Sequence, residues 1–141
     1  MFFQHAHIPR DRSMVFRSRI TRGNIRYQVQ EVDMDEEDDV EDCLAQAVEE
    51  ELRLCEQRFP SGKIIIYYGT IVRAQSISRR LNCPAYYNQA GNAKQKREIL
   101  EEWMEHGRAI VATNALGVGL DVPDVREVIH VTSLRRIRDF A

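Results

Sequence analysis

The chain has 141 residues, of which 43% are apolar and 30% charged, a composition typical of one soluble globular domain that is large enough to bury a core. No apolar run approaches the ~20 residues that span a bilayer. Because Met1–His5 lacks the basic and apolar regions of a signal peptide, we expect an intracellular protein without membrane contacts. The net charge of −2 combines six arginines in residues 1–30 with eight acids in residues 33–42, so it does not exclude a nucleic acid as partner.

The first part of the chain is predicted to hold little regular structure. Residues 1–20 show no sustained periodicity, and their Pro, Asp and Ser residues predict a loop or connector. The segment Ile25–Val29 alternates apolar and polar residues, which predicts a strand with one covered face. The acidic run at residues 33–42 is predicted to be a solvated loop, with a docking site for a basic partner as the alternative.

Amphipathic helices and apolar strands are predicted further along the chain. Residues ~42–58 carry apolar side chains at helical spacing, which predicts a first helix. The run Lys63–Tyr68 is β-branched and aromatic, as is typical of a central parallel strand that is covered on both faces. A second helix is predicted after Gly69-Thr70. Its buried face is predicted to consist of Ile71, Ala74, Ile77 and Leu81.

A third helix and three more strands complete the prediction. Ala85–Tyr87 is predicted to be a short strand, and Asn92 is predicted to cap the third helix with Gln95 at the reciprocal capping-box position. Gly107 is predicted to end this helix. Its inner face is predicted to consist of Ile99, Leu100, Trp103 and Met104. The last two strands are predicted at Arg108–Ala112 and Arg126–Val131.

The alternation of strands and helices from residue 63 onward predicts an α/β fold. Right-handed βαβ crossovers would produce a parallel sheet with helices on both faces. Ligands of such sheets bind beyond the carboxyl ends of the strands. Three segments follow predicted strands, and we expect them to meet at that edge: Thr70, Asn88–Gly91 and Thr113–Asp121.

The common nucleotide and metal motifs are absent from the sequence. Gly117 and Gly119 form G-x-G, but Val122 stands at the third glycine position of the dinucleotide fingerprint, and no G-x-x-x-x-G-K-[ST] loop occurs. Cys43 and Cys55 would lie roughly 18 Å apart on one helix, too far for a disulfide. We therefore expect reduced cysteines, no metal site and no catalytic residue in this chain.

The polar groups at the strand ends are hydroxyls, amides and glycines, which bind a sugar–phosphate backbone without reading bases. Basic side chains on the neighbouring helices are either part of this surface or ordinary solvated helix faces: Arg73, Arg79, Arg80, Lys94, Lys96 and Arg97. The tyrosines at positions 67, 68, 86 and 87 are predicted to be core or strand residues, with stacking on a base as the alternative.

Four segments match motifs that occur together in one family. They are Thr21–Tyr27 (T-R-G-N-I-R-Y), Ile64–Thr70 (I-I-I-Y-Y-G-T), Ala85–Gly91 (A-Y-Y-N-Q-A-G) and Val111–Asp121 (V-A-T-N-A-L-G-V-G-L-D). In this order they resemble the T-R-P-N-x-x-Y segment, motif IV, the Y-H-A-G segment and motif V of RecQ-like superfamily 2 DNA helicases. The string Leu116–Asp121 lacks the arginine of DEAD-box RNA helicases, which favours the RecQ branch.

The resemblance implies a RecA-like second domain, of the P-loop NTPase type, over residues 21–141. It implies that residues 1–20 connect this domain to a first RecA-like domain. Thr70, Asn88, Gly91 and Thr113 would bind the backbone of a nucleic-acid strand. Gly117, Gly119 and Asp121 would contact the nucleotide.

The activity implied for the parent protein is ATP-dependent 3′-to-5′ unwinding of DNA. Its cofactors would be ATP and Mg²⁺, and its partners a single strand, a duplex junction and the first RecA-like domain. The nucleus, DNA repair and DNA recombination are the implied setting in a eukaryote. The phosphate loop, the magnesium site and the arginine finger belong to motifs I, II and VI, which this sequence lacks. We therefore expect neither ATP hydrolysis nor unwinding by this chain alone.

The sequence departs from the family pattern at three positions. Asn88 replaces the histidine of Y-H-A-G, Ile71 replaces an arginine of motif IV, and Gly23 replaces a proline. Three alternatives remain open: a stand-alone nucleic-acid-binding module, a truncated gene product without activity, and one half of a DEAD-box-like RNA helicase.

Overall fold

The structure is a computed structural model that describes residues 23–32, 39–116 and 121–131. The chain divides into two units, Met1–Glu31 and Val32–Ala141. In the first unit, the predicted strand at Ile25–Val29 is wrong, because these residues form no strand and Tyr27 and Val29 are 68% and 83% exposed. An alternating pattern forms a strand only where a neighbouring strand accepts its hydrogen bonds. The predicted connector at residues 1–20 lies outside the described residues.

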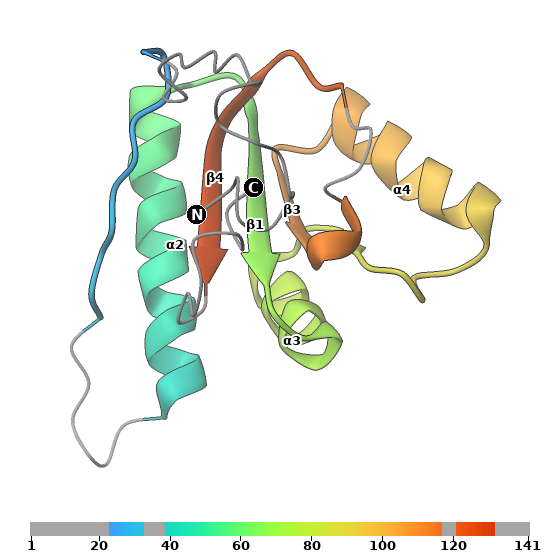
Figure 1. The fold of residues 1–141 in the computed structure, drawn as a ribbon, viewed down its shortest axis with the longest axis horizontal. Coiled ribbons are helices and arrows are strands. Elements are labelled where there is room, and N and C mark those ends of the chain that lie inside the picture. Colours follow the sequence, from blue (N-terminus) through green and yellow to red (C-terminus); the bar gives the residue numbers. More distant parts are fainter. Residues whose placement is uncertain (1–22, 33–38, 117–120, 132–141) are drawn as a thin grey trace, which may run out of the picture. The chain divides into compact units, whose positions relative to one another are not determined.

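The second unit is an α/β fold. Its elements are α2 (Val40–Arg58), β1 (Lys63–Tyr68), α3 (Ile71–Leu81), β2 (Ala85–Tyr86), α4 (Ala93–Glu105), β3 (Ala109–Ala112), the 3₁₀ turn η2 (Asn114–Leu116) and β4 (Val125–Val131). The four strands form one parallel sheet in the order β2-β3-β1-β4, and Figure 1 labels β3, β1 and β4. The predicted alternation of strands and helices is confirmed.

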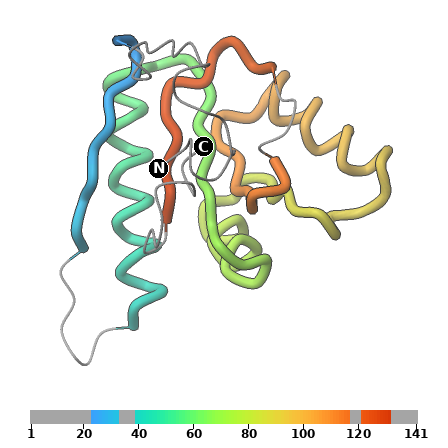
Figure 2. Tube along the Cα trace, in the orientation of Figure 1, coloured from blue at the N-terminus to red at the C-terminus, as the bar shows by residue number. Residues whose placement is uncertain are grey.

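Helices cover both faces of the sheet, as the apolar run of β1 predicts. Ile64, Ile66 and Tyr68 point to the face where α2 and α3 pack. Ile65 points to the opposite face, where Trp103 of α4 and Leu116 of η2 pack. The backbone trace in Figure 2 shows α2 and α4 on either side of the strands. Side chains alternate along a strand, so β1 contributes to both halves of the core.

The acidic run is not wholly a loop. Asp39 caps α2, since its carboxylate accepts a hydrogen bond from the N–H of Glu41 at 3.0 Å, and residues 40–42 are helical. The loop prediction is therefore wrong for residues 40–42. The physical reason is that acids in the first turn interact favourably with the helix dipole. Residues 33–38 lie outside the described part of the chain.

The start of α4 confirms the predicted capping box. The side-chain oxygen of Asn92 accepts hydrogen bonds from the N–H groups of Lys94 and Gln95 at 3.0 Å, and Gln95 Oε1 accepts one from the N–H of Asn92 at 2.9 Å. The predicted inner face is correct for Trp103 but wrong for Met104, which is 40% exposed. Met104 lies about 100° around the helix from Trp103, away from the sheet.

Candidate nucleic-acid interface

The carboxyl ends of three strands align at one edge of the sheet. Ala112, the last residue of β3, pairs with both Tyr67 of β1 and Tyr86 of β2. The segments that begin with Thr70, Asn88 and Thr113 follow these strands, so the expectation that they meet at one edge is confirmed for their described residues, whereas residues 117–120 lie outside the described part of the chain. In Figure 1 this is the edge towards which the β1 arrow points. The ligands of these residues stay predictions.

Thr70 is an exposed residue with a structural role of its own. It is the N-cap of α3, and its hydroxyl oxygen accepts a hydrogen bond from the N–H of Arg73 at 3.4 Å. The hydroxyl proton is a separate donor, which this contact does not use. A helix N-terminus also favours anions through its unpaired N–H groups and dipole. Thr70 thus combines a structural cap with a position suited to a phosphate.

The segment from Asn88 to Gly91 forms a tight turn between β2 and α4. The N–H of Ala90 donates to the carbonyl of Tyr87 at 3.0 Å, and Lys96 Nζ donates to the carbonyl of Asn88 at 3.3 Å. Gly91 has φ +134°, and a Cβ there would lie 2.5 Å from Gln95 Oε1. The turn and the capping box therefore require glycine at position 91, whatever the segment binds.

The main chain of Thr113 is held on both sides. Its N–H donates to the carbonyl of Tyr86 at 3.1 Å, and its carbonyl accepts from the N–H of Leu116 at 3.2 Å. Thr113, which connects β3 to η2 in the chain, is half-buried. Of the predicted nucleotide-contacting residues, Asp121 is exposed, whereas Gly117 and Gly119 lie outside the described residues.

A contact that the sequence pattern does not reveal ties β2 to α3. Gln75 Nε2 donates to the hydroxyl of Tyr87 at 2.7 Å, which fixes the start of the Asn88 turn against the second turn of α3. The two residues belong to different elements, so no periodicity connects them. The packing of α3 against β2 and β3 brings them together.

The basic side chains of the two helices fall into different groups. Arg73 and Arg80 of α3 contact carboxylates of α2, so they are not simply solvated helix surface. Arg79 donates to the carbonyl of Gln75 in its own helix at 3.2 Å. Lys94 lies 3.7 Å from Glu98, within α4. The side chain of Lys96 contacts Asn88, so it links α4 to one of the strand-end segments.

Burial shifts the pKa values of several titratable groups. It raises the pKa of Cys55 to about 12 and that of Cys83 to about 11, so both thiols stay protonated, and Cys43, Cys55 and Cys83 form no disulfide in the described part of the chain. Burial also raises the pKa of Tyr68 to about 12. The ring of Tyr67 stacks on that of His130 at 5.0 Å, and burial lowers the pKa of His130.

Clusters of metal-ligating side chains and membrane-spanning helices are both absent from the described residues. Residues 23–32, 39–116 and 121–131 contain no group of three or more His, Cys, Asp or Glu side chains that are placed to hold a metal ion. In the same ranges, no helix combines the length and apolar character needed to cross a membrane.

Comparisons with known proteins give the family. The chain is 24% identical over 135 residues to the ATP-dependent DNA helicase Q1 of Pongo abelii, an alignment that covers 92% of this chain but only 20% of the relative. The Hef helicase domain of Pyrococcus furiosus is similar in structure, with a TM-score of 0.55 and 27% identity over 62% of this chain and 19% of the other.

A further solved structure supports the fold. Domain 2 of the DEAD-box helicase Mss116p, bound to an RNA duplex, has a TM-score of 0.57 and 16% identity over 71% of this chain and 42% of the other. The parallel sheet described above is thus the RecA-like sheet of helicases. Residues 43–139 match the helicase conserved C-terminal domain, and because this match covers most of the sequence, the chain belongs to that family.

Proposed function

We propose that this chain is the second RecA-like domain of a RecQ-like, ATP-dependent 3′-to-5′ DNA helicase. The observation that carries the proposal is the alignment of the strand ends, which brings Thr70, Asn88 and Thr113 to one edge of the sheet. The DNA substrate is suggested by the similarity to helicase Q1, which is a DNA helicase by name. A nuclear location and work in DNA repair or recombination belong to the same proposal.

In this proposal the edge binds the strand by its phosphates. Two hydroxyls, Thr70 and Thr113, donate to phosphate oxygens, and the turn at Asn88 and Gly91 lets the backbone approach closely. None of these groups reads a base, so binding is expected to depend little on sequence. A motor that moves along a strand requires this property.

The nucleotide would be shared with a first RecA-like domain. Asp121, together with Gly117 and Gly119, would face ATP from this side, and the first domain would supply the phosphate and magnesium ligands. Bound ATP would provide the energy for closing and reopening the cleft between the domains. This chain would hold the strand while the cleft between the two domains closes and reopens.

Replacing Thr113 with valine tests the proposed hydrogen bond between its hydroxyl and a phosphate of the strand. Valine keeps the β-branched shape and removes the hydroxyl, so the Kd for a labelled oligothymidine is expected to rise about tenfold, as for one lost hydrogen bond to a charged group. Fluorescence anisotropy measures the Kd. The control is Ser76→Ala, which removes an exposed hydroxyl of α3 and is expected to leave the Kd unchanged. Equal affinities of the two variants would contradict the role of Thr113.

A comparison of oligothymidine with oligouridine addresses the choice of nucleic acid. Tighter binding of the DNA strand supports the RecQ-like proposal. Clearly tighter binding of the RNA strand would instead favour the DEAD-box-like alternative. The absence of binding to either strand at low salt would refute the proposed function.

The isolated chain is expected to be inactive as an enzyme. Because it has no G-x-x-x-x-G-K-[ST] loop, we expect no ATP hydrolysis above the buffer blank, with or without single-stranded DNA. A coupled phosphate-release assay on the purified 141-residue chain measures this. ATP hydrolysis that is stimulated by single-stranded DNA and copurifies with the chain would contradict the proposal that a first RecA-like domain supplies the phosphate and magnesium ligands.

A further inference from the structure

Two arginines of α3 face α2, but they are held differently. Arg80 is bound by two carboxylates: its Nε and Nη2 contact the two oxygens of Glu49 at 2.7 and 3.2 Å, and its Nη1 contacts Asp42. These hydrogen bonds raise the pKa of Arg80 and lower that of Asp42. Such bidentate, charge-assisted contacts fix the geometry of both partners, so Arg80 clamps α3 to α2.

Arg73 makes a looser contact. Its Nε lies 2.6 Å from Glu41 Oε1, an atom that is itself buried although both side chains are partly exposed, yet within the described part of the chain no donor is aligned to hydrogen-bond that oxygen. The side chains are 49% and 43% exposed. An exposed ion pair without directed hydrogen bonds contributes little and is screened by salt. Glu41 therefore holds Arg73 by charge alone, and an anion with better geometry can replace it.

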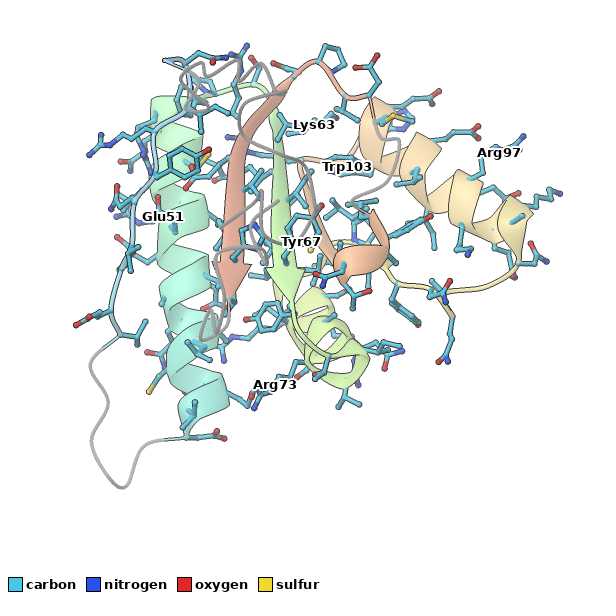
Figure 3. The ribbon with its side chains drawn as sticks, in the orientation of Figure 1. Glu51, Lys63, Tyr67, Arg73, Arg97 and Trp103 are labelled. Carbon is cyan, nitrogen blue, oxygen red and sulfur yellow. The ribbon has the colours of Figure 1, made fainter. Side chains whose placement is uncertain are left out.

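Arg73 is also close to the proposed strand-binding edge. The main-chain N–H of Arg73 donates to the hydroxyl oxygen of Thr70, and Arg73 lies in the first turn of α3. Figure 3 shows Arg73 between α2 and α3, at the end of the sheet towards which β1 points. A guanidinium in this position is within one helical turn of the hydroxyl that is proposed to bind phosphate.

We propose that Arg73 is a further phosphate-binding residue of the strand site and that Glu41 competes with the phosphate for it. The proposal rests on the proposed function and adds to it. A strand that reaches Arg73 exchanges the Glu41 carboxylate for a phosphate, with which the guanidinium forms two directed hydrogen bonds. Glu41 thus lowers the affinity for the strand, which helps a domain that must release and rebind at each step.

The variant Glu41→Gln tests the competition in the 141-residue chain. Loss of the carboxylate is expected to tighten binding of labelled oligothymidine about two- to fivefold, the range that one exposed ion pair represents. The slope of log K against log salt concentration is expected to become steeper by up to about 0.7, because in the unaltered chain the freed Glu41 carboxylate attracts a cation and so offsets the one that the bound phosphate releases. Anisotropy titrations at several salt concentrations measure both quantities.

Two controls separate this effect from a general change of charge. Glu50→Gln removes the same charge from α2 at a residue whose partner is Arg53, 2.6 Å away in the same helix, and it is expected to change neither affinity nor slope. The double variant Glu41→Gln with Arg73→Gln is expected to lose the whole gain. Thermal unfolding followed by circular dichroism verifies that the variants are folded.

The possible outcomes distinguish the two proposals. If Glu41→Gln binds like the unaltered chain, or if the double variant keeps the gain, the role of Arg73 is refuted while strand binding stands. If no variant binds the strand at low salt, both the role of Arg73 and the proposed function are refuted.

Discussion

Replacing Trp103 with alanine is expected to lower the free energy of unfolding by about 3–5 kcal/mol, the usual cost of removing a large aromatic side chain from a core. Trp103 is 0% exposed and packs with Ile65, Ile110 and Leu116 on one face of the sheet. Its indole N–H also donates to the carbonyl of Arg108 at 3.3 Å. Urea unfolding followed by circular dichroism measures the change.

The adjacent residue in the sequence provides the control. Met104→Ala removes a side chain that is 40% exposed and does not belong to the buried cluster, so its cost is expected to stay below about 1 kcal/mol. Similar losses for the two variants would mean that α4 packs on the sheet through a different face. A small loss for Trp103→Ala alone would mean that the cavity collapses around the missing ring.

Local patterns predicted most of the second unit. The bounds of β1 and the capping box of Asn92 and Gln95 follow from side chains that are close in the sequence, and the structure confirms both. The predictions that are wrong concern residues whose structure depends on contacts with segments distant in the sequence. Ile25–Val29 has the alternation of a strand but forms none, and Met104 has helical spacing but lies beyond the contact with the sheet.

The candidate site could be predicted as a set of loops but not as a set of contacts. The resemblance selected Thr70 and Thr113, and strand order placed both at one edge. It did not reveal that Glu41 pairs with Arg73, because helix α2 precedes β1 in the chain and its orientation on the sheet follows from tertiary packing. Opposite charges in two segments become partners only when those segments fold against each other.

Two glycines show the same difference between what the sequence predicts and what the structure explains. Gly91 belongs to the predicted strand-binding set, but its positive φ and its contact with Gln95 already account for it. Gly107, predicted as the end of α4, follows the last helical turn, and its N–H donates to the carbonyl of Glu102 at 3.1 Å. A Cβ at Gly107 would lie 2.9 Å from the Cα of Trp103. Backbone geometry and close contacts therefore account for both glycines without a bound ligand.

Replacing Lys63 with methionine is expected to lower the free energy of unfolding by about 2–3 kcal/mol, because it removes two hydrogen bonds made by a charged, partly buried group. Lys63 Nζ donates to the carbonyls of Trp103 and Gly107 at 2.9 and 2.6 Å. These carbonyls lie at the C-terminus of α4, where a positive charge also interacts favourably with the helix dipole. Figure 3 shows Lys63 at the start of β1, next to Trp103.

Methionine keeps most of the aliphatic length of lysine, so the variant isolates the ammonium group. The matched control is Lys94→Met at the other end of α4, where the side chain is 85% exposed and no measurable change in stability is expected. Lys63 begins β1 at the amino edge of the sheet, opposite the edge where Thr113 lies. The Kd of the folded Lys63→Met variant for single-stranded DNA is therefore expected to equal that of the unaltered chain. If the folded variant binds single-stranded DNA more weakly, a shift of α4 must alter the strand-binding edge, and the Asn88 turn is the segment that connects the two.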